Sequence, residues 1–248
     1  METVFSTVRG LVIRSVRYKD ADCVLTVLTD KMGRITVKAR GAARKNSALS
    51  VSSQLFSCSD MVLYESAGRY TLNEAQVVSQ FEGLRRDLRK MALASYFAEV
   101  LSSGEEAEND AGVLLRLALN CLYALCEKFP ELAVKTAFEL KFATLSGYMP
   151  QLEYCADCAN EVTNGIVDPL SGEIYCGVCG AKRGFYFSER ALSAAKHIVS
   201  CEMKKLLSFS CDENELKTLS DFSGEYLKNC LERPFRTLDF YYGLGDFI

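Results

Sequence analysis

Two closely spaced pairs of cysteines constrain the fold of this chain more than any other feature of its sequence. Cys155 and Cys158 form the first pair, Cys176 and Cys179 form the second, and the spacing reads C-x2-C-x17-C-x2-C. This spacing is typical of a tetrahedral zinc site, because each tight C-x2-C turn can place two sulfurs on one ion. We therefore predict one structural zinc ion per chain, bound by these four thiolates.

A structural role follows from the ligand set. Four cysteines leave no coordination position for an activated water, which a catalytic zinc normally keeps. The motifs of zinc deaminases are also absent. A thioredoxin-like redox pair is the alternative, but it would need only one C-x-x-C in a βαβ setting. Structural zinc can contribute on the order of 10 kcal/mol of apparent folding free energy, enough to order a loop-rich insert.

The remaining cysteines and the apolar segments bear on the compartment. Seven further cysteines are scattered, an odd number that suggests no disulfide framework. The N-terminus does not resemble a signal peptide, and the most apolar stretch, 111–126, is interrupted by Arg116 and Asn120. We therefore expect a cytoplasmic protein that makes no membrane contact.

Charge is unevenly distributed along the chain. The formal net charge is −3, yet residues 1–80 carry eleven Lys and Arg against seven Asp and Glu, a net charge of +4. Residues 81–248 carry eighteen against twenty-five, a net charge of −7. If the protein binds a polyanion, we expect the N-terminal part to bind it.

The N-terminal part has the pattern of a small β-domain. Segments rich in β-branched and aromatic residues alternate with turn signals, and Gly10 is expected to mark a bulge or kink. Five short strands in about 80 residues, with one long loop at 42–54, suit a Greek-key barrel such as an OB-fold. The predicted strands are 4–16, 23–29, 34–41, 56–65 and 69–78.

The third predicted strand carries the candidate DNA-binding residues. Because side chains alternate along a strand, Arg34, Lys38 and Arg40 share one face with Thr36, in a row whose members follow one another at steps of about 7 Å. This step is close to the spacing of phosphates along a nucleic-acid strand. Arg44 and Lys45 extend the positive charge into the following loop. The alternative is a solvated outer face with no ligand.

Aromatic residues in the same domain offer possible stacking surfaces. OB-folds hold single strands by combining cations with aromatic side chains. Tyr18, together with Tyr64 or Tyr70, is the candidate here. The alternative, which we favour for any single tyrosine, is a packing role in the barrel.

Helical periodicity begins at Phe81. Three helices are predicted before the insert, and Asp110 and Pro130 begin the second and third of them. After the insert, Ser188 can cap one helix, Asp212 and Glu215 form a capping box for the next, and 235–244 forms a last short helix. We expect the helices on both sides of the insert to form one bundle.

The sequence thus predicts an α+β chain in which an OB-fold-like barrel precedes a helical domain interrupted by a four-cysteine zinc-binding insert. The expected segments are a nucleic-acid-binding domain (1–80), the first helical part (81–150), the zinc-binding insert (151–187) and the second helical part (188–248).

Motifs of common enzymes are absent. His197 is the only histidine, which excludes an H-E-x-x-H metalloprotease, and its helical pattern favours a surface or packing role. No G-x-S-x-G, Walker A or G-x-G-x-x-G motif occurs. We do not expect an enzyme.

The chain resembles the bacterial RecO family of recombination mediators over its whole length. The local similarity is strongest in the stretches DCVLTVLT (22–29), MGRI (32–35) and VKARGAAR (37–44). The spacing of Arg40, Gly41 and Arg44 is one position wider than the family's (K/R)-G-x-R pattern. The four cysteines occur in many members of the family.

This resemblance implies a bacterial, nucleoid-associated protein with a non-enzymatic role in DNA repair and recombination. Such proteins bind single- and double-stranded DNA and anneal complementary strands. They act on DNA coated by single-stranded DNA-binding protein and, with RecR, help load the RecA recombinase at gaps. A protein-interaction adaptor is the alternative, in which a zinc ribbon forms the binding surface and the basic strand has no direct DNA role.

Overall fold

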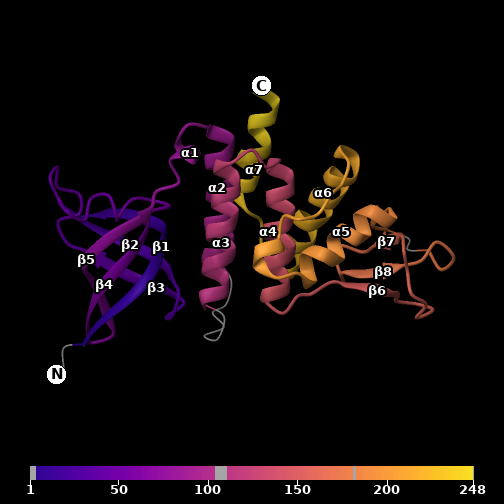
Figure 1. Cartoon of the computed structure of the whole chain (residues 1–248), viewed down its shortest axis with the longest axis horizontal. Helices are drawn as coiled ribbons and strands as arrows, with labels where there is room; N and C mark the ends of the chain where they lie inside the picture. Colours follow the sequence, from indigo (N-terminus) through magenta and orange to yellow (C-terminus); the bar gives the residue numbers. More distant parts are fainter. Residues whose placement is uncertain (1–3, 104–110, 181–182, 248) are drawn as a thin grey trace. The chain divides into compact units, whose positions relative to one another are not determined.

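The computed structural model describes residues 4–103, 111–180 and 183–247. Its N-terminal part is a closed five-stranded barrel (Figure 1). The strands close in the order β1-β2-β3-β5-β4, and all neighbours are antiparallel except β3 and β5. The Greek-key barrel predicted from the sequence is therefore confirmed. Its strands are β1 (Val4–Tyr18), β2 (Asp22–Thr29), β3 (Arg34–Ala39), β4 (Cys58–Ser66) and β5 (Arg69–Ser79).

The barrel core is built from alternating apolar side chains. On β2, Cys23, Leu25 and Val27 are buried, while Val24 and Thr26 between them are half-buried. The strand period of two produces this division, and the inward set packs with residues of the other four strands. The buried core includes Val8, Val12, Leu25, Val27, Val37, Ala39, Met61, Leu63 and Leu72.

The prediction of a bulge at Gly10 was wrong. The register of β1 against β2 shifts between Val12 and Arg14 instead. At Gly10 the strands approach closely, because an added Cβ would lie 2.5 Å from Cγ1 of Val27. The glycine thus permits close packing, and the extra residue that bends the strand lies farther along.

Three helices share the compact unit of the barrel, which spans Met1–Cys126. Helices α2 (Leu88–Ser103) and α3 (Ala111–Cys126) contact β1, α3 also contacts β2, and α1 (Glu82–Arg85) packs against both helices. We expected a single bundle containing the helices on both sides of the insert, but the contacts group α1–α3 with the barrel. The predicted helix cap at Asp110 lies outside the described residues.

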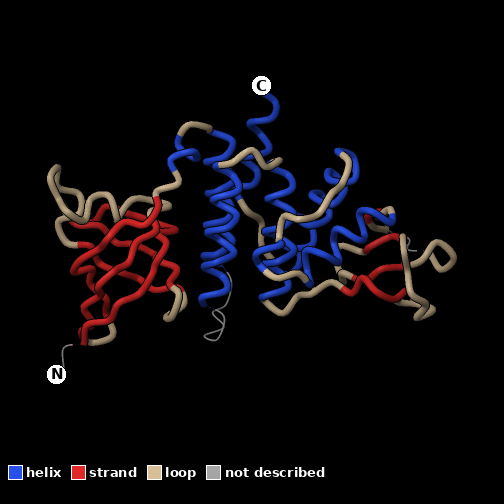
Figure 2. Tube along the Cα trace, in the orientation of Figure 1, coloured by secondary structure: helices blue, strands red, loops and turns tan. Residues whose placement is uncertain are grey.

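The second compact unit, Glu127–Ile248, combines helices with a small sheet (Figure 2). Helix α4 packs against α5 and α6, and the sheet order is β6-β8-β7-β9. No helix among the residues that the structure describes is both long and apolar enough to cross a membrane. The elements are α4 (Glu131–Leu145), β6 (Gln151–Cys155), β7 (Gly165–Val167), β8 (Glu173–Tyr175), β9 (Phe185–Phe187), α5 (Glu189–Ser200), α6 (Glu213–Cys230) and α7 (Arg236–Gly243).

Side-chain caps begin two of these helices as predicted. The Ser188 hydroxyl accepts a hydrogen bond from the Ala191 N–H at the start of α5, and Asp212 and Glu215 form the capping box of α6. The Ser188 hydroxyl also donates to Glu215 at 2.6 Å. One carboxylate therefore ties the starts of two helices together.

A fully buried ion pair lies between α4 and α6. Lys135 Nζ is 2.8 Å from a carboxylate oxygen of Glu139 and 2.8 Å from the Ser220 carbonyl, and Ser223 donates to the same carboxylate. Burial is the largest single influence on the pKa of Lys135 and lowers it, but the charges and hydrogen bonds of Glu139 and Tyr242 together outweigh burial, so the pKa is raised. The ammonium is therefore retained in the interior, hydrogen-bonded to the Glu139 side chain.

We predict that Lys135→Met destabilises the protein by about 3–5 kcal/mol, because it leaves the Glu139 carboxylate buried without its cation. The double variant Lys135→Met/Glu139→Leu should lose less stability than Lys135→Met, since no unpaired charge remains buried. The exposed pair Arg86–Glu82 has the same i,i+4 spacing and is the matched control, with an expected cost for Arg86→Met of at most about 0.5 kcal/mol. Urea titrations measure the free energy of unfolding of all three variants. Equal losses for the two Lys135 variants would show that the unpaired Glu139 charge is not the cause of the destabilisation.

Candidate nucleic-acid surface and four-cysteine centre

Strands β1, β2 and β3 present a continuous surface on the outside of the barrel. Directly paired residues share a face of a sheet, so the register defines rows across the three strands. One row is Arg14–Thr26–Thr36 and the next is Val16–Val24–Lys38. We call this surface the outer barrel face, and it comprises Arg14, Val16, Tyr18, Val24, Thr26, Thr36 and Lys38, with Arg40 directly after β3.

Lys38, Tyr18 and Asp22 interact at one end of this face. Tyr18 pairs with Asp22 across β1 and β2, and the residue is 46% exposed. The Lys38 ammonium lies 5.6 Å from the centroid of that ring and 3.0 Å from a carboxylate oxygen of Asp22. The predicted cation and the predicted aromatic side chain are thus neighbours. Such a pair is the combination with which OB-folds hold single strands.

The other predicted cations occupy different settings. The Arg34 guanidinium donates to the Leu101 carbonyl at 2.9 Å, so it contacts the end of α2. Arg40, Arg44 and Lys45 are exposed. The structure therefore brings Lys38 and Arg40 together on the outer barrel face, places Arg44 and Lys45 in the adjoining loop, and sets Arg34 apart.

Main-chain contacts hold that loop against the β1–β2 hairpin. The Gly41 N–H donates to the Asp22 carboxylate and the Ala43 N–H donates to the Ala21 carbonyl, both at 2.9 Å. Ala42 between them is buried in the barrel core. Arg40 and Arg44 are consequently carried by backbone that is fixed on both sides of Gly41.

Arg14 and Val16 were missed from the sequence. Val8, Gly10 and Val12 are buried, so strict alternation would also turn positions 14 and 16 into the barrel. The register shift after Val12 reverses the alternation and exposes both side chains. The available signal was the bulge expected at Gly10, because one extra residue at either place reverses the alternation and turns Arg14 and Val16 outward.

The remaining candidate tyrosines pack within the barrel unit. Tyr64 contacts the Phe5 ring at a centroid distance of 5.6 Å, and Tyr70 packs partly buried against the core. Arg9, another cation of β1, forms two hydrogen bonds with the Asp60 carboxylate at 2.8 and 3.0 Å. This pairing neutralises the charge of Arg9 where β1 pairs with β4.

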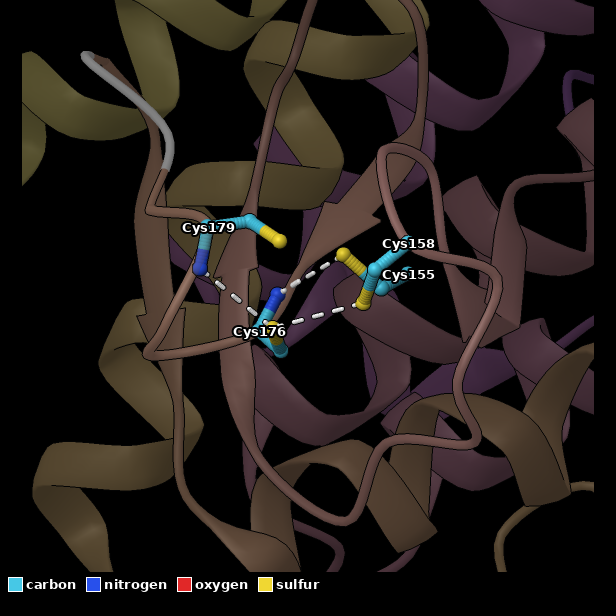
Figure 3. A group of neighbouring side chains, drawn as sticks. All are labelled: Cys155, Cys158, Cys176 and Cys179. Carbon is cyan, nitrogen blue, oxygen red and sulfur yellow. Dashed lines mark hydrogen bonds between the residues drawn. The ribbon is translucent and has the colours of Figure 1, made fainter.

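The four cysteines converge at one end of the small sheet (Figure 3). Their sulfurs all lie within 4.8 Å of one another, and those of Cys158 and Cys176 are 3.9 Å apart. Tetrahedral thiolates at the usual Zn–S distance of about 2.3 Å would be separated by about 3.8 Å, so the observed spacing fits a metal centre. It does not fit a disulfide, and none of the eleven cysteines, all of which lie in the described part of the chain, is in a disulfide.

Both C-x2-C turns have the same backbone. In the first, the Ala159 N–H donates to the Cys155 carbonyl, and in the second the Gly180 N–H donates to the Cys176 carbonyl. Ala159 and Gly180 both have positive φ, at 56° and 63°. A glycine suits this conformation, which the sequence signalled at Gly180 but not at Ala159.

Backbone donors prepare the sulfurs for ionisation. The Cys176 N–H points at the Cys155 sulfur from 3.3 Å, and it is the main cause that lowers the pKa of Cys155 to about 6. The pKa of Cys179 is instead raised to about 12, chiefly by its hydrogen bond with the Cys158 sulfur. A cation among the sulfurs is needed to ionise all four. The cluster can therefore hold one metal ion with four thiolates and no open position.

Other sequence expectations in this unit concern His197. Its Nε2 lies 2.7 Å from the Lys205 carbonyl, which links the end of α5 to the following turn. The histidine therefore has a structural contact, as its helical pattern suggested.

Comparison with known families covers nearly the whole chain. A model described as "Recombination protein O N terminal" matches residues 1–81, and one described as "Recombination protein O C terminal" matches residues 85–239. The first match ends near the end of β5, and the second contains the four cysteines.

Individual relatives agree with this assignment. A DNA repair protein RecO of Acetivibrio thermocellus is 31% identical over 236 residues, which cover 93% of this chain and 94% of that protein. Proteins of the same name from Symbiobacterium thermophilum and Clostridium perfringens are 32% and 26% identical, over 80% and 93% of this chain. Together with the outer barrel face and the four-cysteine centre, these matches show that the chain belongs to the RecO family of DNA repair proteins, which are recombination mediators and not enzymes.

Proposed function

We propose that the protein binds single- and double-stranded DNA on the outer barrel face and anneals complementary strands. The observation that carries this proposal is the placement of Arg14, Lys38 and Arg40 on one exposed surface beside the Tyr18 ring. The cations would neutralise phosphates, and the ring would stack on an unpaired base. The net charge of +4 in residues 1–80 supports this location.

Annealing by such a surface requires no covalent chemistry. Two complementary strands repel each other through their phosphates, and a cationic face that binds both lowers this repulsion. Duplex formation then proceeds by base pairing, while the protein supplies only charge and proximity. Binding and annealing should both weaken steeply with salt, because each phosphate contact releases condensed counterions.

We further propose that the protein works with partner proteins of the family's pathway. By family resemblance, these are RecR, single-stranded DNA-binding protein and, indirectly, the RecA recombinase at gapped DNA. Residues 81–248 carry a net charge of −7, which suits contacts with proteins better than contacts with DNA. The comparisons support this assignment through family membership.

For the four cysteines we propose one structural zinc ion. Cys155, Cys158, Cys176 and Cys179 would hold it, and thiolates are the ligands that zinc prefers in closed tetrahedral sites. The ion would fix the two turns that join the strands of the small sheet. That sheet packs on α6 through Phe187 and Phe222, so the metal would brace the second unit from outside its core.

The first prediction tests the DNA surface. In the full chain, Arg14→Gln/Lys38→Gln/Arg40→Gln should weaken oligonucleotide binding and reduce the slope of log affinity against log salt by about two units, because up to three phosphate contacts are lost. Arg85→Gln/Arg86→Gln/Lys128→Gln removes the same charge from exposed positions outside the face and is the control. Equal slopes for the two triple variants would assign DNA binding to another surface.

A second prediction separates stacking from charge. Tyr18→Leu should reduce binding of single-stranded DNA by about 1–3 kcal/mol while leaving duplex binding nearly unchanged, since duplex bases are not free to stack on the ring. Tyr18→Phe retains the ring and should bind single strands as the wild type does. Fluorescence anisotropy with matched single- and double-stranded oligonucleotides measures both, and a parallel loss on the two DNAs would exclude stacking by Tyr18.

The third prediction concerns the metal. Elemental analysis should find about one zinc per chain, and Cys155→Ser/Cys158→Ser should lose both the zinc and thermal stability while still binding DNA below its melting temperature. Cys211→Ser is the control, because Cys211 lies outside the cluster. If the double variant melted at the temperature of the wild type, the ion would have no structural role.

A further inference from the structure

The Asp22 carboxylate is the meeting point of several donors at the edge of the outer barrel face. One oxygen accepts the Gly41 N–H at 2.9 Å, and the other is 3.0 Å from the Lys38 ammonium. The Gly41 N–H is the main cause that lowers the pKa of Asp22, Lys38 follows, and the charge of Arg40 contributes as well. The carboxylate is 22% exposed and therefore lies at the surface of the protein.

The backbone at Gly41 is shaped for an anion. Gly41 has φ of +66°, and a turn of this kind can present backbone N–H groups toward a negatively charged group. The stem of the Arg44 side chain passes close by, with its Nε 3.6 Å from the position of a Cβ on Gly41. One main-chain donor and the side chains of Lys38, Arg40 and Arg44 thus surround a single small region of the surface.

This set of donors is one that proteins use for phosphate. A backbone N–H in a positive-φ turn, an ammonium and guanidinium groups each bind anionic oxygens, and together they bind phosphodiesters. A carboxylate offers the same two oxygens to the same donors. Asp22 therefore occupies the subsite with a group of the chain itself.

We infer that Lys38 and Arg40, beside the Gly41 turn, form a phosphodiester subsite whose anion in the free protein is Asp22. The inference rests on the proposed function, and it identifies the position on the outer barrel face where one phosphate of a bound strand sits. A phosphate enters by taking Lys38 from Asp22, while Asp22 keeps the Gly41 N–H and hence the loop. Asp22 thereby lowers DNA affinity, because a bound phosphate has to replace the existing ion pair between Lys38 and Asp22.

Asp22→Asn separates the two roles of this side chain. Its amide oxygen can still accept the Gly41 N–H, so the loop stays in place, but the negative charge that holds Lys38 is gone. We expect Asp22→Asn to bind oligo-dT about three- to fivefold more tightly than the wild type, with a slope against salt steeper by about 0.7, the value for one more phosphate contact on a single strand. Asp20→Asn removes the same charge from an exposed residue of the same hairpin and is the matched control.

The decisive measurement is a double-mutant cycle in the full chain. The gain from Asp22→Asn should disappear when Lys38 is replaced by Met, whereas any small gain from Asp20→Asn should persist. If Asp22→Asn binds no better than wild type while Lys38→Met still weakens binding, the subsite is wrong and the DNA surface stands. If neither Lys38→Met nor Arg40→Gln changes binding, the proposed DNA surface itself fails.

A second comparison does not depend on a variant at position 22. Because Asp22 already neutralises Lys38, Lys38→Met should reduce the salt slope of the wild-type chain by less than Arg40→Gln does. Thermal melting first confirms that each variant is folded. Equal reductions for Lys38→Met and Arg40→Gln would show that Asp22 leaves Lys38 fully available, which would overturn the inference.

Discussion

Strand β1 has to pair with two neighbours, with β4 along its first part and with β2 along its second. The extra residue between Val12 and Arg14 allows the strand to bend from one partner to the other. The same residue turns Arg14, Val16 and Tyr18 to the outside, where strict alternation would have buried them. Both the closure of the barrel and the composition of its outer face therefore depend on this one shift of register.

Features that depend on near neighbours in the chain could be predicted. The two C-x2-C turns, the Ser188 cap and the Asp212–Glu215 box involve residues only a few positions apart, and each is present. The alternation of β2 and β3 was equally local and correctly separated the core from the surface. The five-stranded barrel followed from the number and spacing of such segments.

Features that depend on residues distant in the sequence could not be predicted. The Arg34 side chain belonged to the predicted basic row, but it donates to the Leu101 carbonyl of a helix much farther along the chain. The helices could be recognised from their periodicity, yet periodicity does not say which partner each apolar face meets. Ala159 adopts a positive φ because the geometry of the cysteine turn requires it, although its residue type gives no sign of it.

The barrel is closed by its shortest pairing, since β3 and β5 are joined in parallel through Val37–Tyr70 and Lys38–Thr71 alone. The hairpins β1–β2, β2–β3 and β4–β5 bring together residues that are close in sequence, whereas this seam and the β1–β4 pairing join residues that are far apart. Contacts of long sequence separation carry a larger loop-closure entropy and tend to form late in folding. Lys38 lies in the seam, so in a chain emerging from the ribosome the strand that carries it is paired on both sides only when the last strand, β5, has been added.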